Sequence, residues 1–169
     1  MSAASAAGWN EFEGRPPAWV RIVLRRVVGL LLVAFGLVVG LSLWGFTPGD
    51  PTWNHATSAP LMNPLGGLGA NLADLLLQCL GQAAWLLPVI AIARGIREAL
   101  GRPLAWPWLP LVAFPLAVLA AAAFMGSLEL PPRGEWPFRV GLGGFVGDYL
   151  LNRLIPVLGS GFYGFVTGL

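Results

Sequence analysis

The apolar run VVGLLLVAFGLVVGLSLWGF at residues 27–46 decides the fold class of this chain. Its length is about that needed to cross the hydrocarbon core of a bilayer as a helix. A cleavable signal peptide would carry its charges nearer the start, and a shorter apolar core would precede a small-residue cleavage site. Neither feature is present, so we predict a permanent transmembrane helix over residues 27–46 that follows a cytoplasmic tail over residues 1–26.

Three more apolar segments follow, and loops that contain proline separate them. We predict that these segments span the membrane at about residues 68–93, 104–125 and 146–168. The sequence therefore predicts an all-α membrane protein with four transmembrane helices in residues 27–169. Because the last segment ends with the chain and has no flanking charge, we expect the sequence to be part of a longer protein.

The composition agrees with a membrane location and excludes several kinds of chemistry. Hydrophobic residues make up 56% of the chain and charged residues 11%, against about 25% charged residues in ordinary soluble domains. All ten basic residues are arginines. The absence of lysine excludes a P-loop ATPase, which needs a lysine to reach the phosphates, and it excludes Schiff-base catalysis.

The positions of the arginines predict the orientation of the chain. Those that flank the apolar segments fall mostly on one side of the predicted membrane: Arg15, Arg21, Arg25, Arg26, Arg94, Arg97 and Arg102. Only Arg133 and Arg139 flank the other side. Since loops rich in arginine stay in the cytoplasm, we predict that both the N-terminus and the C-terminus are cytoplasmic.

Two segments resemble each other weakly. LGGLGANLADLLLQCLG begins at Leu65 and LGGFVGDYLLNRLIPVLG begins at Leu142, and both have paired glycines, an early aspartate and a later Leu-Gly step. Their alignment needs one inserted residue. The likeness indicates a possible parallel two-helix repeat.

Gly36 and Gly40 form a GxxxG pattern in the first predicted span. Such spacing lets two helix backbones approach closely and gain van der Waals contact. The pattern fits packing within this chain, and it also fits contact with a second copy or with a partner helix.

Three ionisable residues lie within apolar segments: Asp74, Asp148 and Arg153. Charges inside a membrane are costly and are candidates for function. Asp74 and Asp148 fall near the predicted outer starts of their helices, where the helix dipole favours a carboxylate, so a structural or interfacial role is expected. Arg153 could extend to the interface or pair with Asp74. The alternative interpretation is a transport path in a small transporter or channel component.

No arrangement of residues predicts catalysis or ligand binding. The lone His55 and the single Cys79 cannot form a metal-binding cluster, and Cys79 lies in an apolar run as a buried hydrophobic residue would. A membrane-embedded enzyme would need a nucleophile and a base, and no such pair is evident. We expect no catalytic, metal-binding or cofactor-binding residues.

Two stretches resemble the N-terminal membrane domain of the FtsK/SpoIIIE family of DNA translocases: GFTPGDPTW from Gly45 and NPLGGLGANLADLLLQCLGQAAWLLP from Asn63. The resemblance covers roughly residues 27–95. It rests on the Asp50-Pro51 pair, the turn from Asn63 through Gly66, Gly67 and Gly69, the Ala73-Asp74 step, and the stretch from Gly81 to Pro88.

This resemblance implies a four-helix anchor in the bacterial inner membrane, placed at the division septum, which tethers an ATP-driven DNA motor. The motor itself is absent from this sequence. The expected partners are the lipid bilayer, other division proteins and further copies of the chain. We expect no binding of DNA or nucleotides by this segment and no cofactor.

Overall fold

The computed structural model describes residues 17–102, 108–128 and 141–158, with side chains described as far as Arg153 in the last range. The described residues form α-helices and one short 3-10 helix, with only an isolated bridge between Thr52 and His55. The elements are α1 (Ala18–Trp44), α2 (Gly66–Leu80), η2 (Gly81–Trp85), α3 (Leu86–Ala99), α4 (Leu109–Ser127) and α5 (Gly144–Leu158). Three stretches are long and apolar enough to cross a membrane: α1, α4 and the continuous run Gly66–Ala99. An all-α membrane protein is therefore confirmed for the described part.

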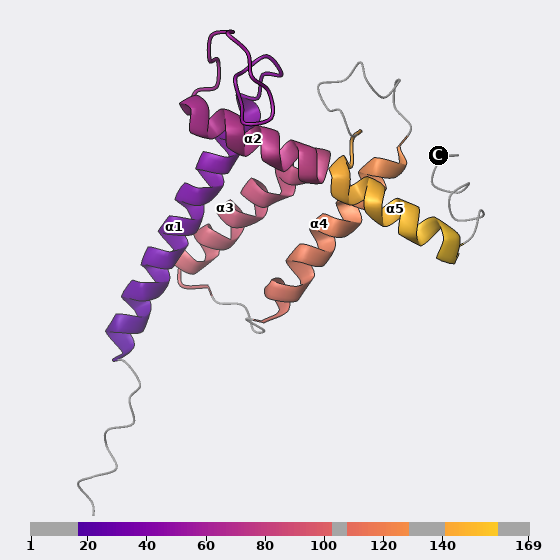
Figure 1. The fold of residues 1–169 in the computed structure, drawn as a ribbon. Coiled ribbons are helices and arrows are strands. Elements are labelled where there is room, and N and C mark those ends of the chain that lie inside the picture. Colours follow the sequence, from indigo (N-terminus) through magenta and orange to yellow (C-terminus); the bar gives the residue numbers. More distant parts are fainter. Residues whose placement is uncertain (1–16, 103–107, 129–140, 159–169) are drawn as a thin grey trace, which may run out of the picture.

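The helices α1, α3 and α4 run along the length of the molecule, while α2 and α5 lie at its upper end (Figure 1). Helix α2 crosses the upper end of α1, and after η2 the chain turns so that α3 descends beside α1 (Figure 1). Helix α5 follows α4 and packs against its upper part (Figure 1). The loop of residues 45–65 covers the upper end of α1, opposite the arginine-bearing ends of α1 and α3.

The second predicted span is bent where the sequence predicted a single helix over residues 68–93. The structure places helix from Gly66 to Ala99 but interrupts it at η2. Gly81 begins this interruption with φ +57°, a conformation that a side chain would strain. A Cβ atom there would also collide with the carbonyl group of Leu142. A single glycine within an apolar segment does not by itself predict that the helix is interrupted there.

The other helix bounds differ from the predicted spans at their ends. Helix α1 begins at Ala18, so residues 18–26 of the predicted tail belong to the helix. Helix α4 ends at Ser127 instead of 125, and its predicted start at 104 lies outside the described residues. Helix α5 begins at Gly144 and is described to Leu158, while the rest of the predicted fourth span lies outside the described residues.

The two segments of the predicted repeat share their local structure. Each of α2 and α5 begins at a glycine with positive φ, +66° at Gly66 and +64° at Gly144. The turn before each helix is closed in the same way, because the Gly66 N–H donates to the Asn63 carbonyl and the Gly144 N–H donates to the Gly141 carbonyl. When Gly66 is aligned with Gly144, the two helices match without the inserted residue that the sequence alignment needed. In this alignment Asp74 corresponds to Asn152 and not to Asp148.

The contact between α1 and α3 depends on glycines. A Cβ atom at Gly29 would lie 2.5 Å from the Ala99 nitrogen and 2.6 Å from the Gly95 oxygen. A Cβ atom at Gly95 would meet Gly29 and Val33 at similar distances. The two antiparallel helices therefore touch through their backbones, which gives the van der Waals contact that holds helices together in lipid.

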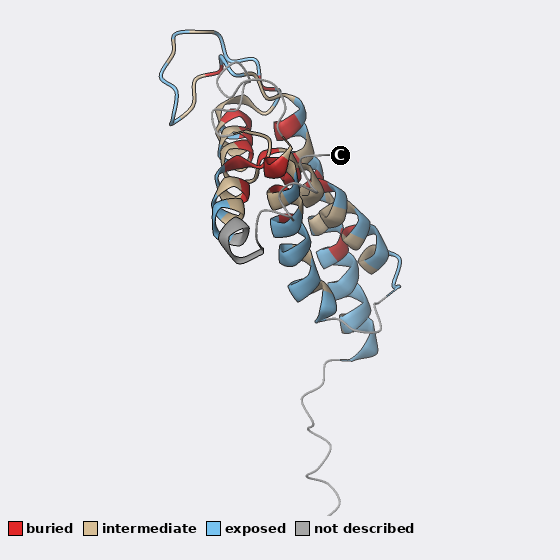
Figure 2. Cartoon of the chain, turned by 90° about the vertical axis from the view of Figure 1, so that its right-hand side faces the viewer, coloured by how far each residue is buried: buried red, intermediate tan, exposed pale blue. Residues whose placement is uncertain are grey.

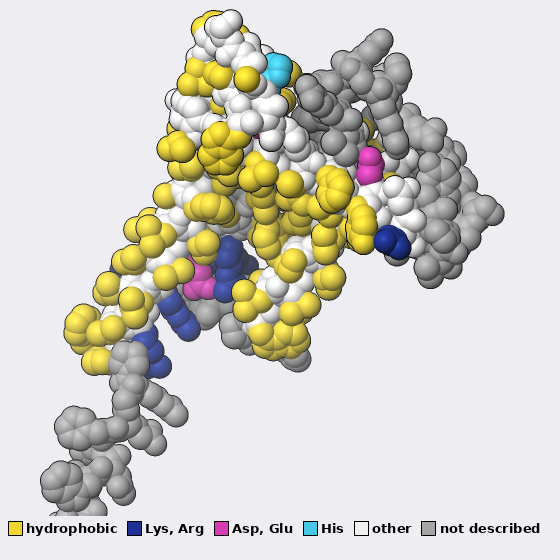
Figure 3. Space-filling model, viewed as in Figure 1, with side chains coloured by type: hydrophobic (Ala, Val, Ile, Leu, Met, Phe, Trp, Pro, Cys, Tyr) yellow, Lys and Arg dark blue, Asp and Glu magenta, His cyan; other side chains and the backbone are white. Residues whose placement is uncertain are grey.

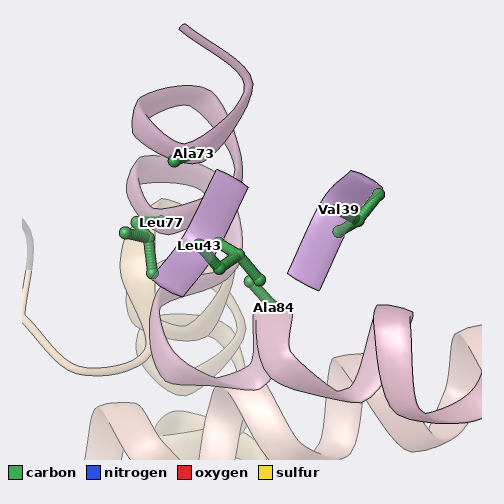
Figure 4. Packing of buried hydrophobic residues seen from close by; sticks show 5 residues of the cluster. All are labelled: Val39, Leu43, Ala73, Leu77 and Ala84. Atoms are coloured by element: carbon green, nitrogen blue, oxygen red, sulfur yellow. The ribbon is translucent and has the colours of Figure 1, made fainter. Parts of the chain in front are cut away.

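The best-buried apolar cluster lies where α1, α2 and η2 meet, and it consists of Val39, Leu43, Ala73, Leu77 and Ala84 (Figure 4). Most buried residues gather near this end, whereas the lower lengths of the helices are largely exposed (Figure 2). The exposed surface is itself apolar, with side chains such as Leu30, Phe35 and Leu111 more than half exposed (Figure 3). Such a surface is stable in contact with lipid chains.

Candidate functional site

The loop of residues 45–65 is fastened by one buried carboxylate. Asp50 is only 2% exposed, although its side chain is polar. Its Oδ1 accepts a hydrogen bond from the Met62 N–H at 2.8 Å, and its Oδ2 accepts one from the Asn63 N–H at 3.0 Å. Asp50 therefore closes the loop by joining its first part to its last, and the two bonds satisfy a group that would otherwise be costly to bury.

Asn63 attaches the closed loop to two helices. Its Nδ2 donates to the carbonyl oxygen of Ser42 near the end of α1, at 3.0 Å. Its Oδ1 accepts from the Leu65 N–H, also at 3.0 Å, directly before α2 begins. The hydroxyl of Ser42 in turn donates to the Val38 carbonyl within α1. The buried Asn63 side chain therefore holds the end of α1 against the start of α2.

Small residues make room for this arrangement. A Cβ atom at Gly69 would collide with the Asn63 side chain, and one at Gly45 would collide with the ring of Pro64. Gly66 has the positive φ already described, whereas Gly67 has no neighbour within 4 Å of its Cβ position. Pro51 follows the fastened Asp50 and is half-buried. Among Gly66, Gly67 and Gly69, only Gly67 has no evident structural requirement for glycine.

Asp74 of α2 also holds the same loop in place, through hydrogen bonds. Its Oδ2 accepts hydrogen bonds from the Thr52 hydroxyl at 3.0 Å and from the Asn54 amide at 3.1 Å, and its Oδ1 accepts one from the Gln78 amide at 2.8 Å. One turn earlier on α2, the Asn71 side chain accepts from the Trp53 N–H at 2.7 Å. Asp74 therefore lies at the end of the helix bundle, within a polar network.

Of the two alternatives for Arg153, the structure does not show the pairing with Asp74. Arg153 is exposed and lies over the Tyr149 ring, 5.4 Å from its centroid, while the oxygens of Asp74 bond to the loop. The reason is geometric: the end of α2 meets the start of α5, and the Gln82 N–H donates to the Leu142 carbonyl at 2.8 Å. The helices do not place the middle of α2 beside the later half of α5. Asp148, near the start of α5, is partly buried and close to Gly126.

The glycines of the first span pack inside the chain. A Cβ atom at Gly36 would lie 2.6 Å from the Ile92 side chain and 3.0 Å from the Pro88 oxygen, so Gly36 is needed against α3. A Cβ atom at Gly40 would make only an ordinary contact of 3.5 Å with Pro88. The close contact therefore uses Gly29 and Gly36, seven residues apart, and not the GxxxG pair. Gly29 was missed, although its spacing of two turns from Gly36 could have indicated it.

The described residues contain no group of three histidine, cysteine, aspartate or glutamate side chains that could hold a metal. The groups that donate hydrogen bonds to Asp50 and Asp74 belong to the loop, except the Gln78 amide, which lies in α2 itself. The site therefore positions a loop on a helix pair, and its chemistry is that of a structural support. Sequence reasoning identified Asp50, Asn63 and Asp74 but missed Ser42 and Thr52, because a hydroxyl has no distinctive spacing.

Residues 21–167 match the family model described as the 4TM region of the DNA translocase FtsK/SpoIIIE. The chain is 34% identical over 145 residues to a DNA translocase FtsK of Caulobacter vibrioides, a match that covers 83% of this chain and 17% of the relative. It is 37% identical over 163 residues to one of Mesorhizobium japonicum, covering 90% of this chain and 16% of the relative. The chain thus spans about a sixth of the length of these relatives. No solved structure gives a significant match.

Proposed function

Because this chain belongs to the FtsK/SpoIIIE family of DNA translocases and corresponds to its 4TM region, we propose that it is the membrane anchor of such a translocase. In this proposal it holds an ATP-driven DNA motor, carried by another part of the protein, at the division septum. The match to the membrane region alone carries the proposal, since the relatives named DNA translocase FtsK extend far beyond the part that this chain covers. Three stretches apolar enough to cross a membrane support it.

The anchor lies in the bacterial inner membrane with four spans and with both ends in the cytoplasm. The arginine distribution supports this orientation. Apart from Arg153 in α5, six of the seven described arginines lie at the neighbouring ends of α1 and α3: Arg21, Arg25, Arg26, Arg94, Arg97 and Arg102. The loop of residues 45–65 then faces outward. A motor attached to the cytoplasmic end would lie on the same side of the membrane as the chromosome.

The outward loop is the part best suited to contact other division proteins. Asp50, Asn63 and Asp74 hold it in one conformation, so a partner would not have to order it on binding. The Trp53 side chain is 82% exposed, although the Trp53 N–H donates a hydrogen bond to Asn71. The Met62 side chain is 67% exposed, although the Met62 N–H donates to Asp50. Large exposed side chains on a rigid loop are typical of recognition surfaces.

The transporter alternative has less support. Asp74 is engaged with loop residues at one end of the bundle, and Arg153 lies at the surface over Tyr149. A relay would need polar groups in line across the membrane. The chain has no lysine for a P-loop, and the arginines that flank its apolar segments are explained as signals of orientation, so we propose that this segment binds neither nucleotide nor duplex DNA.

Reporter fusions test the anchoring orientation. Alkaline phosphatase, which folds only outside the cytoplasm, is expected to be active when fused after His55 and inactive when fused after Glu98 or at the C-terminus. Green fluorescent protein at the same positions serves as the matched control and is expected to give the opposite pattern. Phosphatase activity at the C-terminus would contradict the proposal, because the motor would then lie on the wrong side of the membrane.

A further inference from the structure

A hollow of about 220 Å³ lies at the arginine-rich end of α1, lined by Ala18, Arg21, Ile22 and Arg25. Ala18, Ile22 and Arg25 are spaced by three or four residues and continue to Gly29, so they share the face of α1 that packs on α3. Gly29 contacts Gly95 and Ala99, which are near the end of α3. The hollow therefore lies just past the end of α3, where that helix no longer covers α1.

The surroundings of the hollow are strongly cationic. Because α1 and α3 are antiparallel and touch at Gly29 and Ala99, the turn that holds Arg102 lies near the level of Arg25. Among the described residues this end carries six arginines and one acidic residue, Glu98. Glu98 is already paired with Arg94 at 2.6 Å. Other arginines at this end are exposed and have no acidic partner among the described residues, including Arg21, Arg25, Arg97 and Arg102.

An apolar surface begins directly beside these charges. Val23, Leu24, Val27 and Val28 on α1 are each about half exposed, as is Ile96 on α3. Figure 3 shows basic side chains gathered around an acidic one at this end, with apolar side chains continuing along the helices. A ligand that matches both parts needs an anionic group next to hydrocarbon chains.

We propose that this end of the α1–α3 pair is a binding site for an anionic phospholipid. The phosphate group occupies the hollow against Arg21 and Arg25, and the acyl chains lie along the apolar faces of α1 and α3. Clusters of basic side chains at the membrane end of a helix recognise anionic headgroups in this way. The inference goes beyond the anchoring function and holds for either orientation of the chain, although the orientation decides which leaflet supplies the lipid.

Native mass spectrometry of the chain, released from vesicles that contain equal amounts of phosphatidylglycerol and phosphatidylcholine, tests the proposal. We expect selective retention of phosphatidylglycerol. The double substitution R21Q/R25Q is expected to reduce this selectivity about 30-fold, since each arginine near a membrane surface contributes about 1 kcal/mol. The variant R21K/R25K keeps both charges and is expected to retain most of the selectivity.

The control variant is Arg153→Gln, which removes an exposed arginine from α5, far along the chain from the hollow. It is expected to leave lipid selectivity unchanged. Equal retention of both lipids by the unaltered chain would overturn the proposal, as would an equal loss in Arg153→Gln. Displacement of the lipid by inorganic phosphate would assign the site to free phosphate instead. If R21Q/R25Q does not fold, as judged by circular dichroism, Arg21→Gln alone is measured, with an expected loss of about 5-fold.

Discussion

An alanine at Gly29 is expected to lower the stability of this membrane domain by about 2 kcal/mol, because it forces α1 away from α3. The added Cβ would lie 2.5 Å from the Ala99 nitrogen and 2.6 Å from the Gly95 oxygen. Both are backbone atoms, so no rotation of a side chain can relieve the clash. In lipid the lost contact is not replaced by a hydrophobic driving force, since the separated helix faces remain in an apolar medium.

Gly40→Ala is the matched control for this substitution. It lies in the same helix, yet its Cβ would make only an ordinary contact of 3.5 Å with Pro88. We expect it to be neutral or to stabilise α1 by up to about 1 kcal/mol, the usual gain of alanine over glycine within a helix. Thermal unfolding in detergent micelles gives the comparison. Equal stability of Gly29→Ala and Gly40→Ala would show that α1 and α3 do not pack through their backbones.

Asp50→Ala is expected to release the loop of residues 45–65 at a cost of about 3 kcal/mol. The substitution leaves the N–H groups of Met62 and Asn63 without their acceptor, and each unsatisfied buried donor costs about 1–3 kcal/mol. The loop is then held to the helices chiefly through Asn63 and Asp74. Its cleavage by an added protease is therefore expected to rise together with the loss of thermal stability.

Two variants keep this test specific. Asp50→Asn retains one acceptor oxygen but turns an amide N–H₂ toward a second donor, so an intermediate loss is expected. Asn54→Ala removes one hydrogen bond of the exposed Asn54 side chain to Asp74 and is expected to cost less than 1 kcal/mol. If Asp50→Ala were no more sensitive to protease than Asn54→Ala, the buried carboxylate would not be what closes the loop.

The sequence was sufficient to predict the helical class, because runs such as residues 27–46 can satisfy their backbone in a membrane only as helices. It also indicated Asp50, Asn63 and Asp74, through the resemblance of their surroundings to a known membrane domain. It could not predict the bend at Gly81. That bend depends on the carbonyl of Leu142, which is distant in sequence.

The sequence also left open whether Arg153 pairs with Asp74, for the same reason. The cost of an isolated charge in a membrane predicts that each needs a partner, but it does not say which residue supplies it. Asp74 found its partners in Thr52 and Asn54 of the neighbouring loop, and Arg153 found an aromatic ring one turn away. Periodicity describes single helices, whereas these partners depend on how α2 lies across α1 and meets α5.

Fluorescence microscopy of dividing bacterial cells tests most directly whether this region anchors a DNA translocase at the division septum, as we propose. The chain, carrying a fluorescent protein at its C-terminus, is expected to form a band at midcell in cells that are constricting. Gly29→Ala, which loosens α1 from α3, is expected to weaken this band at equal expression. Uniform fluorescence around the cell membrane, with no enrichment at the septum, would contradict the claim.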